Sequence, residues 1–206
     1  METGGSGALG ASPARQVDEI DRLRAHEYNL LANLLGRAPD VHTLQLLGEL
    51  EGDASPLGAA HAALAAAARS ARPDAVSREF FDLFIGVGRG ELLPYASYYL
   101  TGFLNERPLA RVREDLLAIG AERAETQREP EDHVALLLET MAGLASGQLD
   151  AEPGVERRFF ERHLKPWAER FFADLEGAKF ADLYRHVGAL GRLYMEVEAE
   201  AFAIDA

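Results

Sequence analysis

The sequence of 206 residues contains no cysteine. This absence excludes disulfide bonds, cysteine-ligated zinc, iron–sulfur clusters held by this chain and thiol catalysis, and it is compatible with a reducing compartment. Aromatic residues are also scarce, at 8%, and few segments alternate between apolar and polar positions as strands do. Hydrophobic residues reach 48%, and because many of them are Ala and Leu, helix propensity is high almost throughout. The composition therefore predicts an all-α fold.

Long apolar runs are missing as well. No segment approaches the ~20 consecutive apolar residues of a membrane-spanning helix. Residues 1–16 are rich in Gly, Ala and Ser and lack the basic start and apolar core of a secretory signal, so we expect a disordered tail there. These features predict a cytoplasmic protein that does not insert into a membrane.

Basic residues are in the minority. The chain has 21 Lys and Arg against 34 Asp and Glu, which gives a net charge of -13. Such a chain lacks the basic face that is typical of nucleic-acid-binding proteins, so we expect no nucleic-acid partner. A basic partner would be favoured over an acidic one, but charge alone favours ordinary solubility over any specific cationic ligand as the reason for the acidity.

Gly and Pro residues divide the sequence into about nine to ten predicted helices. The expected helices cover residues 17–36, 39–50, 55–72, 74–84, 94–104, 108–120, 130–145, 153–163, 166–175 and 180–202. Residues 121–129 are polar and charged without an apolar period. We therefore expect a linker or hinge at 121–129, between an N-terminal helical lobe at 17–120 and a C-terminal helical lobe at 130–206.

Helix starts and buried faces are also predicted by local patterns. Ser55 followed by Pro56 is typical of a helix start, and Asp74 is expected to cap the next helix. The expected apolar face of the first helix consists of Ile20, Leu23, Leu30, Leu31, Leu34 and Leu35. The expected core of the C-terminal lobe consists of Phe159, Phe160, Trp167, Phe171, Phe172 and Leu175.

Three tyrosines follow Pro94 within a short segment. Tyr95, Tyr98 and Tyr99 are three and four residues apart, so on a helix they would share one face. Two interpretations stay open. The rings could form a stripe at the edge of the core with satisfied hydroxyl groups, or they could form the wall of a groove that binds a peptide.

The segment Glu129-Pro130-Glu131-Asp132-His133 is the most specific short run. If Pro130 begins a helix, Asp132 lies in its first turn, where a carboxylate is stabilised and can cap free amides. Adjacent residues on a helix point about 100° apart, so Asp132 and His133 form neither a catalytic dyad nor a chelating pair. For Asp132, helix capping or a contact between lobes and binding of a peptide arginine both remain open. For His133, we expect an interlobe or core hydrogen bond.

Several catalytic and metal-binding patterns are absent from the sequence. No His-x-x-x-His or Glu-x-x-His pattern is present, and no Gly-x-Ser-x-Gly motif could hold a serine nucleophile. The glycine-rich run from Gly86 to Gly90 follows a predicted helix, whereas a dinucleotide-binding fingerprint follows a strand. We interpret these glycines as permitting a sharp exit after Phe84 and a close approach of the loop to a neighbouring helix. The sequence therefore predicts neither a catalytic site nor a metal site.

Four blocks together resemble the TorD/DmsD/NarJ-type family of chaperones for redox enzymes. They are Glu79 to Gly88, Pro94 to Tyr99, Glu129 to His133 and Phe159 to Trp167. The resemblance implies a TorD-like helical bundle without catalytic activity. It implies a chaperone that binds the twin-arginine signal peptide and the apo form of a molybdopterin-dependent oxidoreductase, assists cofactor insertion and prevents premature export. An assembly scaffold for a redox-enzyme subunit that is not exported is the alternative.

The same resemblance implies a binding site and a range of partners. A receptor for a peptide that joins two arginines to an apolar segment needs carboxylates and apolar walls. The candidate peptide-binding residues are Leu83, Phe84, Glu91, Tyr95, Tyr98, Tyr99, Glu131, Asp132 and His133. No stably bound cofactor is expected, although transient contact with the molybdopterin cofactor or a guanine nucleotide is possible. The resemblance allows a monomer or a domain-swapped homodimer.

Overall fold

The computed structural model describes residues 17–121 and 128–204, and within these ranges the regular secondary structure is helical. The helices are α1 (Glu19–Gly36), α2 (Val41–Gly48), α3 (Pro56–Ser70), α4 (Pro73–Phe80), the π-helix η1 (Phe81–Ile85), α5 (Ala96–Thr101), α6 (Arg107–Ala118), α7 (Val134–Ala145), α8 (Val155–His163), α9 (Ala168–Glu176) and α10 (Leu183–Ile204). The all-α prediction is confirmed. The predicted tail at 1–16 and residues 122–127 of the predicted linker lie outside the described ranges.

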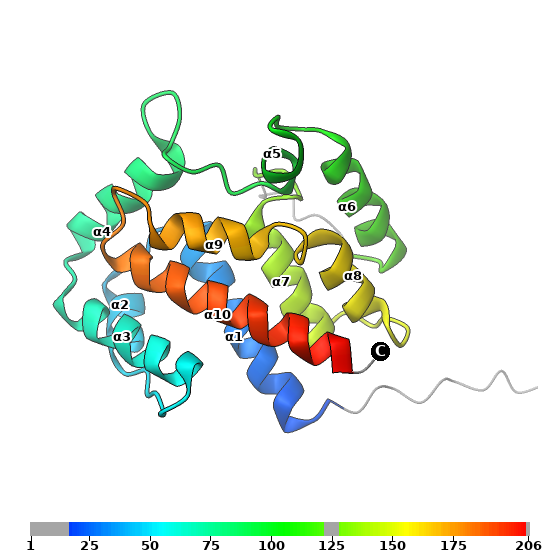
Figure 1. Ribbon diagram of the computed structural model, residues 1–206, viewed down its shortest axis with the longest axis horizontal. Coiled ribbons are helices and arrows are strands. Elements are labelled where there is room, and N and C mark those ends of the chain that lie inside the picture. The colour runs from blue at the N-terminus through cyan, green and yellow to red at the C-terminus, as the bar shows by residue number, and fades with distance from the viewer. Residues whose placement is uncertain (1–16, 122–127, 205–206) are drawn as a thin grey trace, which may run out of the picture.

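Two pairs of long helices form the centre of the molecule. α1 packs along α7, and α10 packs along α9 on the side facing the viewer in Figure 1. α2 and α3 pack together at one end, where α3 also contacts α10, while α5, α6 and α8 lie toward the other end. None of the described helices is both long enough and apolar enough to cross a bilayer.

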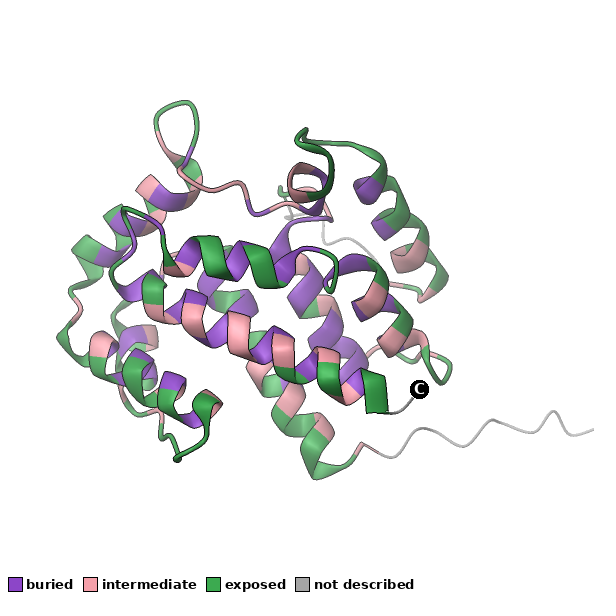
Figure 2. Ribbon diagram, viewed as in Figure 1, coloured by how far each residue is buried: buried purple, intermediate pink, exposed green. Residues whose placement is uncertain are grey.

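One hydrophobic core connects these helices (Figure 2). It includes Leu31 of α1 and Leu138 of α7, which are both fully buried, and the predicted aromatic residues of the C-terminal half are buried as well. Each such side chain contributes roughly 1.5–3 kcal/mol by leaving water. The core is therefore continuous between residues that precede and follow 122–127, and the division into two lobes stays a prediction.

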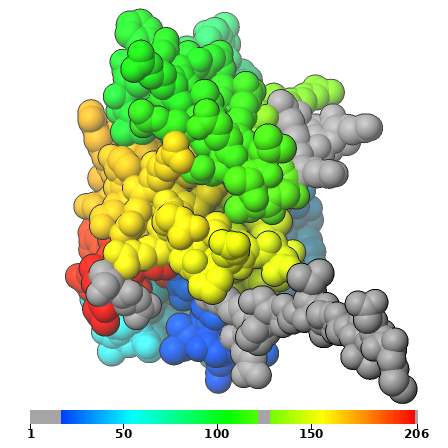
Figure 3. Space-filling view, turned by 90° about the vertical axis from the view of Figure 1, so that its right-hand side faces the viewer, coloured from blue at the N-terminus to red at the C-terminus, as the bar shows by residue number. Residues whose placement is uncertain are grey.

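α6 packs against α8, and the two helices adjoin on the face shown in Figure 3, where α6 is green and α8 is yellow. Arg162 of α8 donates to both carboxylate oxygens of Asp115 on α6, at 2.8 and 2.9 Å. His163 also contacts Asp115, with 2.6 Å between its Nε2 and an Oδ2 oxygen. A single carboxylate of α6 thus joins two neighbouring side chains of α8.

The start of α1 corrects one prediction. Ile20 and Leu23 are 66% and 62% exposed, so they do not belong to the buried face. The inward positions of these first turns are occupied by Asp21 and Arg24, whose side chains are 14% and 17% exposed. A polar cluster replaces apolar packing at the start of α1. The spacing of apolar residues alone therefore predicted the wrong buried face for the first turns of this helix.

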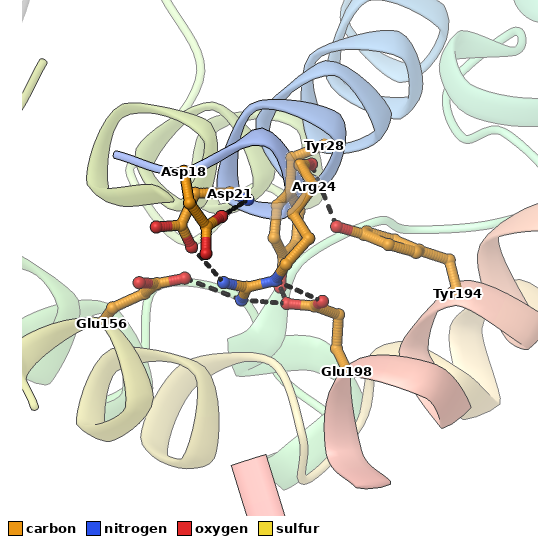
Figure 4. A network of polar contacts seen from close by, with 7 residues as sticks. All are labelled: Asp18, Asp21, Arg24, Tyr28, Glu156, Tyr194 and Glu198. Atoms are coloured by element: carbon orange, nitrogen blue, oxygen red, sulfur yellow. Dashed lines mark hydrogen bonds and ion pairs between the residues drawn. The ribbon is translucent and has the colours of Figure 1, made fainter. Parts of the chain in front are cut away.

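The Arg24 cluster (Asp18, Asp21, Arg24, Tyr28, Glu156, Tyr194 and Glu198) ties α1 to α8 and α10 (Figure 4). Arg24 donates to both oxygens of Glu198, from Nε at 2.7 Å and from Nη2 at 2.6 Å. Its Nη2 also lies 2.7 Å from an oxygen of Glu156. Tyr28 donates to Glu198 at 2.6 Å, and Tyr194 donates to the backbone oxygen of Arg24 at 3.0 Å. The cluster therefore fixes the first half of α1.

Helix boundaries follow the predictions with two exceptions. Ser55 caps α3 and accepts from the backbone N–H of Gly58, as expected. Asp74 does not cap α4, because the cap position is Arg72, which makes no side-chain cap bond, and Asp74 lies in the first turn. The helix expected from Pro130 begins at Val134. This later start leaves the preceding residues free for the pairing described next.

Candidate functional site

Two segments far apart in the sequence meet to form the junction, which we define as residues 94–97 and 129–134. Tyr95 and His133 form an isolated antiparallel bridge. The backbone N–H of Ala96 donates to the oxygen of Asp132 at 3.0 Å, and the N–H of Val134 donates to the oxygen of Pro94 at 2.8 Å. The two most specific sequence segments are thus held together by main-chain hydrogen bonds.

Asp132 lies at the centre of the junction and is 1% exposed. One of its carboxylate oxygens accepts from the backbone N–H of Ser97 at 2.8 Å, and the Ser97 hydroxyl donates to the same oxygen. Asp132 therefore caps a helix, as one interpretation expected. The helix is α5 and not the one that follows Asp132 in the sequence, because the cap of α7 is His133.

His133 is a buried neutral histidine. Burial lowers its pKa from 6.5 to about 4, against the opposing effect of the carboxylates of Glu129 and Asp132. Its Nδ1 accepts from the backbone N–H of Ala135 at 3.2 Å, so the ring proton resides on Nε2. Among the described residues, no hydrogen-bond partner contacts this Nε2, and His133 lines a pocket.

The tyrosines of the first segment do not share one face. Tyr95 precedes α5, and its hydroxyl donates to Glu129 at 2.5 Å while its ring contacts the His133 ring edge-on, with 5.1 Å between centroids. Tyr99 packs on Trp167 at 5.3 Å and donates to Asp174 at 3.0 Å. Burial and the neighbouring carboxylates raise the pKa of both tyrosines, so their hydroxyl groups remain donors at neutral pH.

Tyr98 has a third kind of environment. The guanidinium of Arg89 lies over its ring at 5.2 Å and donates to its hydroxyl oxygen at 2.8 Å. The spacing argument failed because Tyr95 is extended and the helix begins only at Ala96. The rings of Tyr98 and Tyr99 contact each other edge-on, with 6.0 Å between centroids, whereas the Tyr95 ring lies against His133, and each ring is partly exposed.

The predicted carboxylates already have partners within the molecule. Glu91 accepts from the backbone N–H groups of Lys179 and Phe180, at 2.8 and 3.1 Å. Glu131 pairs with Arg113, whose Nε lies 2.8 Å away. A peptide arginine could reach Glu131 by exchanging with Arg113, which is 53% exposed, whereas Glu91 holds the turn before α10.

Glu79 has a similar structural role that the motif comparison did not reveal. It accepts from the backbone N–H groups of Asp182 and Tyr184, each at 2.7 Å, and from that of Leu183 at 3.3 Å. These bonds satisfy the free amides at the start of α10. Burial raises the pKa of the Glu79 carboxyl, against the effect of these three hydrogen bonds.

The predicted apolar walls are mostly internal. Leu83 is fully buried, and Phe84 packs against Phe80 and Tyr184 with ring centroids 5.1 and 5.5 Å apart. The loop that follows returns over this segment so closely that a Cβ atom on Gly90 would lie 2.6 Å from the Leu83 oxygen. These glycines do permit a close approach, but the loop approaches the helical segment that precedes it and not the neighbouring helix that was expected.

Two adjoining hollows lie along the second half of α1. The polar pocket has a volume of about 260 Å³ and is lined by Asn29, Ala32, Asn33, Gly36, Arg37, Glu129, His133, Ala135, Leu136 and Glu139. The leucine pocket has a volume of about 270 Å³ and is lined by Leu30, Asn33, Leu34, Arg37, Pro39, Thr43, Leu46, Leu47 and Leu50. Both contain Asn33 and Arg37. Within the described ranges, no group of three or more His, Asp and Glu side chains could hold a metal ion.

Comparison with known proteins identifies the family. The family described as "Nitrate reductase delta subunit" matches residues 50–173, more than half of the chain. The chain belongs to this family. This finding confirms the resemblance to TorD/DmsD/NarJ-type proteins that the sequence blocks indicated.

Several curated relatives of this chain are named "Chaperone protein TorD". The protein from Vibrio cholerae (strain M66-2) is 36% identical over 105 residues, covering 47% of this chain and 48% of the relative. The protein from Vibrio atlanticus (strain LGP32) is 25% identical over 138 residues, covering 62% and 64%. The chain spans about half the length of the first of these relatives. Their name agrees with the expectation that this chain is not an enzyme.

A solved structure shares the fold. It is described as a putative redox enzyme maturation protein from Archaeoglobus fulgidus, and it superimposes with a TM-score of 0.56 at 17% identity, covering 90% of this chain and 98% of the other. The junction lies inside the region matched by the delta subunit family. α1 lies before that region, so the polar pocket combines residues from inside and outside it.

Proposed function

We propose that this protein is a cytoplasmic maturation chaperone for a molybdopterin-dependent oxidoreductase. It binds the apo form of this client and its twin-arginine signal peptide, assists cofactor insertion and prevents export before insertion is complete. The observation that carries the proposal is the junction, where the two specific segments of the family-matched region meet at a partly polar, partly aromatic surface. The chaperone names of the relatives support the same role.

The chemistry of the surface fits such a peptide. A signal peptide with two arginines and an apolar segment needs carboxylates close to apolar side chains. Glu129, Glu131 and Tyr95 belong to the junction, and Tyr98 and Tyr99 present ring surface directly after its first segment. Asp132 is buried and holds α5, so its contribution to binding is to position the junction. The net charge of -13 favours a basic ligand at long range.

Calorimetric titration with leader peptides tests this proposal. Each synthetic leader of a candidate molybdoenzyme is paired with a version in which both arginines are replaced by alanine. Micromolar or tighter binding that weakens on replacement supports the proposal and identifies the client. Absence of binding to every leader contradicts the signal-peptide part of it.

The alternative is an assembly scaffold that binds a redox-enzyme subunit without a signal peptide. The family description, a delta subunit of nitrate reductase, favours this candidate. Binding to the mature apoenzyme, with no binding to any leader, would establish the scaffold role.

Two further expectations remain proposals. Transient contact with the molybdopterin cofactor or a guanine nucleotide is tested by equilibrium dialysis against GTP and against the isolated cofactor. The choice between a monomer and a domain-swapped homodimer is tested by light scattering across a range of protein concentrations.

A further inference from the structure

The polar pocket and the leucine pocket form one continuous surface. Asn33 of α1 and Arg37, the residue that directly follows α1, line both of them. The far side of the polar pocket contains the carboxylates of Glu129 and Glu139, and the far side of the leucine pocket contains side chains from α2. An extended ligand could therefore contact apolar groups at one end and acidic groups at the other.

We propose that this surface is where the client peptide binds. A large apolar side chain of the peptide fills the leucine pocket, and an arginine side chain enters the polar pocket beside Glu129 and Glu139. This inference rests on the proposed function and specifies where the peptide binds. It differs from the residue set predicted from the sequence, since α1 and α2 supply most of the contacts.

The acidic end favours a guanidinium group. Glu139 is exposed, and no described residue pairs with it, so its carboxylate is available to a ligand. Glu129 accepts the Tyr95 hydroxyl through one oxygen. Arginine binds carboxylates through paired hydrogen bonds, which gives such contacts both strength and orientation. Arg37 is the opposing charge on this surface, and it lies at the border between the pockets.

His133 supplies a second observation that points to a ligand. Its side chain is more than nine-tenths buried, yet its Nε2–H has no partner among the described residues, and the ring lines the polar pocket. The Nε2 atom itself keeps access to the pocket, so it can donate to a ligand there. A main-chain carbonyl of a bound peptide would satisfy it, and the side chains of Asn29 and Asn33 offer further polar contacts nearby.

The apolar end has the character of a side-chain pocket. It is lined mainly by leucines, and one of them, Leu46, is 52% exposed. Filling the pocket with a leucine or phenylalanine side chain would remove apolar surface of both partners from water. Since the leucine and polar pockets share residues, one short peptide can reach both.

The test uses a fluorescein-labelled peptide with two adjacent arginines followed by a Leu- and Ala-rich segment, and its affinity is measured by fluorescence anisotropy. We expect Leu46→Glu to weaken binding about tenfold and Glu139→Gln about fivefold. Arg37→Glu should tighten binding about threefold to tenfold, because it removes the opposing charge. The matched controls Leu117→Glu, Glu169→Gln and Arg22→Glu change exposed residues outside both pockets and should bind like the wild type.

A crosslinking experiment locates the peptide independently. A benzophenone group replaces one apolar side chain of the same peptide, and the crosslinked protein is digested with trypsin. We expect the crosslink in the fragment of residues 38–69, which contains the α2 side of the leucine pocket, and not in residues 90–111, which contain Tyr95, Tyr98 and Tyr99.

Two results would overturn the inference, and they differ in what else they imply. If the wild type binds the peptide but the three pocket variants bind equally well, or the crosslink falls in residues 90–111, the peptide binds elsewhere and the proposed function stands. If the wild type binds neither this peptide nor any leader, the signal-peptide function fails together with the inference. Tightening by Arg37→Glu is the most informative result, because a loss of folding cannot produce it.

Discussion

The junction and the Arg24 cluster each bury a carboxylate, but they stabilise it differently. Asp132 in the junction accepts from the backbone N–H and the hydroxyl of Ser97, both neutral donors. Glu198 in the Arg24 cluster faces a guanidinium and a tyrosine hydroxyl. The neutral donors at Asp132 cap the short helix α5. The ion pair of Arg24 neutralises buried charge where α1, α8 and α10 meet. The cluster should therefore dominate global stability, and the junction should control local geometry.

The largest expected effect is in the Arg24 cluster. Arg24→Ala leaves Glu198 and Glu156 buried without their cation, and we expect the free energy of unfolding to fall by about 3–5 kcal/mol. Urea denaturation measures this loss. Arg22→Ala, on the exposed side of the same helix, is the control and should change stability by less than about 0.5 kcal/mol.

A double variant separates charge from packing at this site. Arg24→Met combined with Glu198→Gln removes the cation and one buried charge together, so we expect it to recover the part of the lost stability that belongs to Glu198, while Glu156 keeps its charge. If Arg24→Ala costs less than about 1 kcal/mol, the cluster is not the main electrostatic support of α1.

The next largest effect concerns pH and the junction. The pKa of His133 is about 4 in the folded protein and 6.5 in the reference state. Because the folded value is the lower one, the unfolded chain binds more protons between these pH values. The contribution to stability is thus present above pH 6.5 and is lost as the pH falls toward 4. A shift of this size corresponds to about 3 kcal/mol.

The measurement compares wild type with His133→Gln by urea denaturation at several pH values between 4 and 7. We expect the wild type to lose stability on acidification more steeply than the variant. Other groups titrate in both proteins, so their contributions to the pH dependence of stability cancel in the comparison. One of them is His61, whose hydrogen bond to Glu27 raises its pKa and so gives a contribution of opposite sign. Titration of the His133 ring by NMR with a midpoint near its usual value would contradict the prediction.

A smaller effect is expected at Asp132. Asp132→Asn keeps the size of the side chain but replaces a charged acceptor by a neutral one, so we expect a loss of about 1–2 kcal/mol. Faster amide hydrogen exchange should be confined to α5 and the segment before it. Asp174→Asn, at an exposed acceptor of the Tyr99 hydroxyl, is the control. Uniformly faster exchange across α1 and α10 would show that the junction supports the whole fold.

Local chemistry made most of the fold predictable. Proline and cap residues mark helix starts wherever the donor and acceptor are close in sequence, as at Ser55. The start of α7 was misplaced because residues 129–133 pair with residues 94–97, a contact that no local pattern contains. The exposed positions of Ile20 and Leu23 were missed because the inward residue is the charged Arg24, which pairs with helices much later in the chain.

The candidate site was predictable in part. The run that contains Asp132 and His133 was recognised as the most specific segment, but the polar side of α1 was not connected to it. Asn29 and Asn33 are spaced four residues apart and so share one face of the first helix, and Arg37 directly follows that helix. That signal was available in the sequence. Its meaning depends on the packing of α1 against α7, which only the three-dimensional arrangement shows.

The smallest effect on stability is expected at the surface pair of the junction. Arg113 is 53% exposed and pairs with Glu131 at 2.8 Å, so Arg113→Ala should change the free energy of unfolding by at most about 0.5 kcal/mol. Its effect on binding separates the two proposed sites. If the peptide arginine bound Glu131, removal of the competing cation should tighten binding, whereas binding in the polar pocket predicts little change. Anisotropy titrations of Arg113→Ala and Arg37→Glu with the same peptide make that comparison directly.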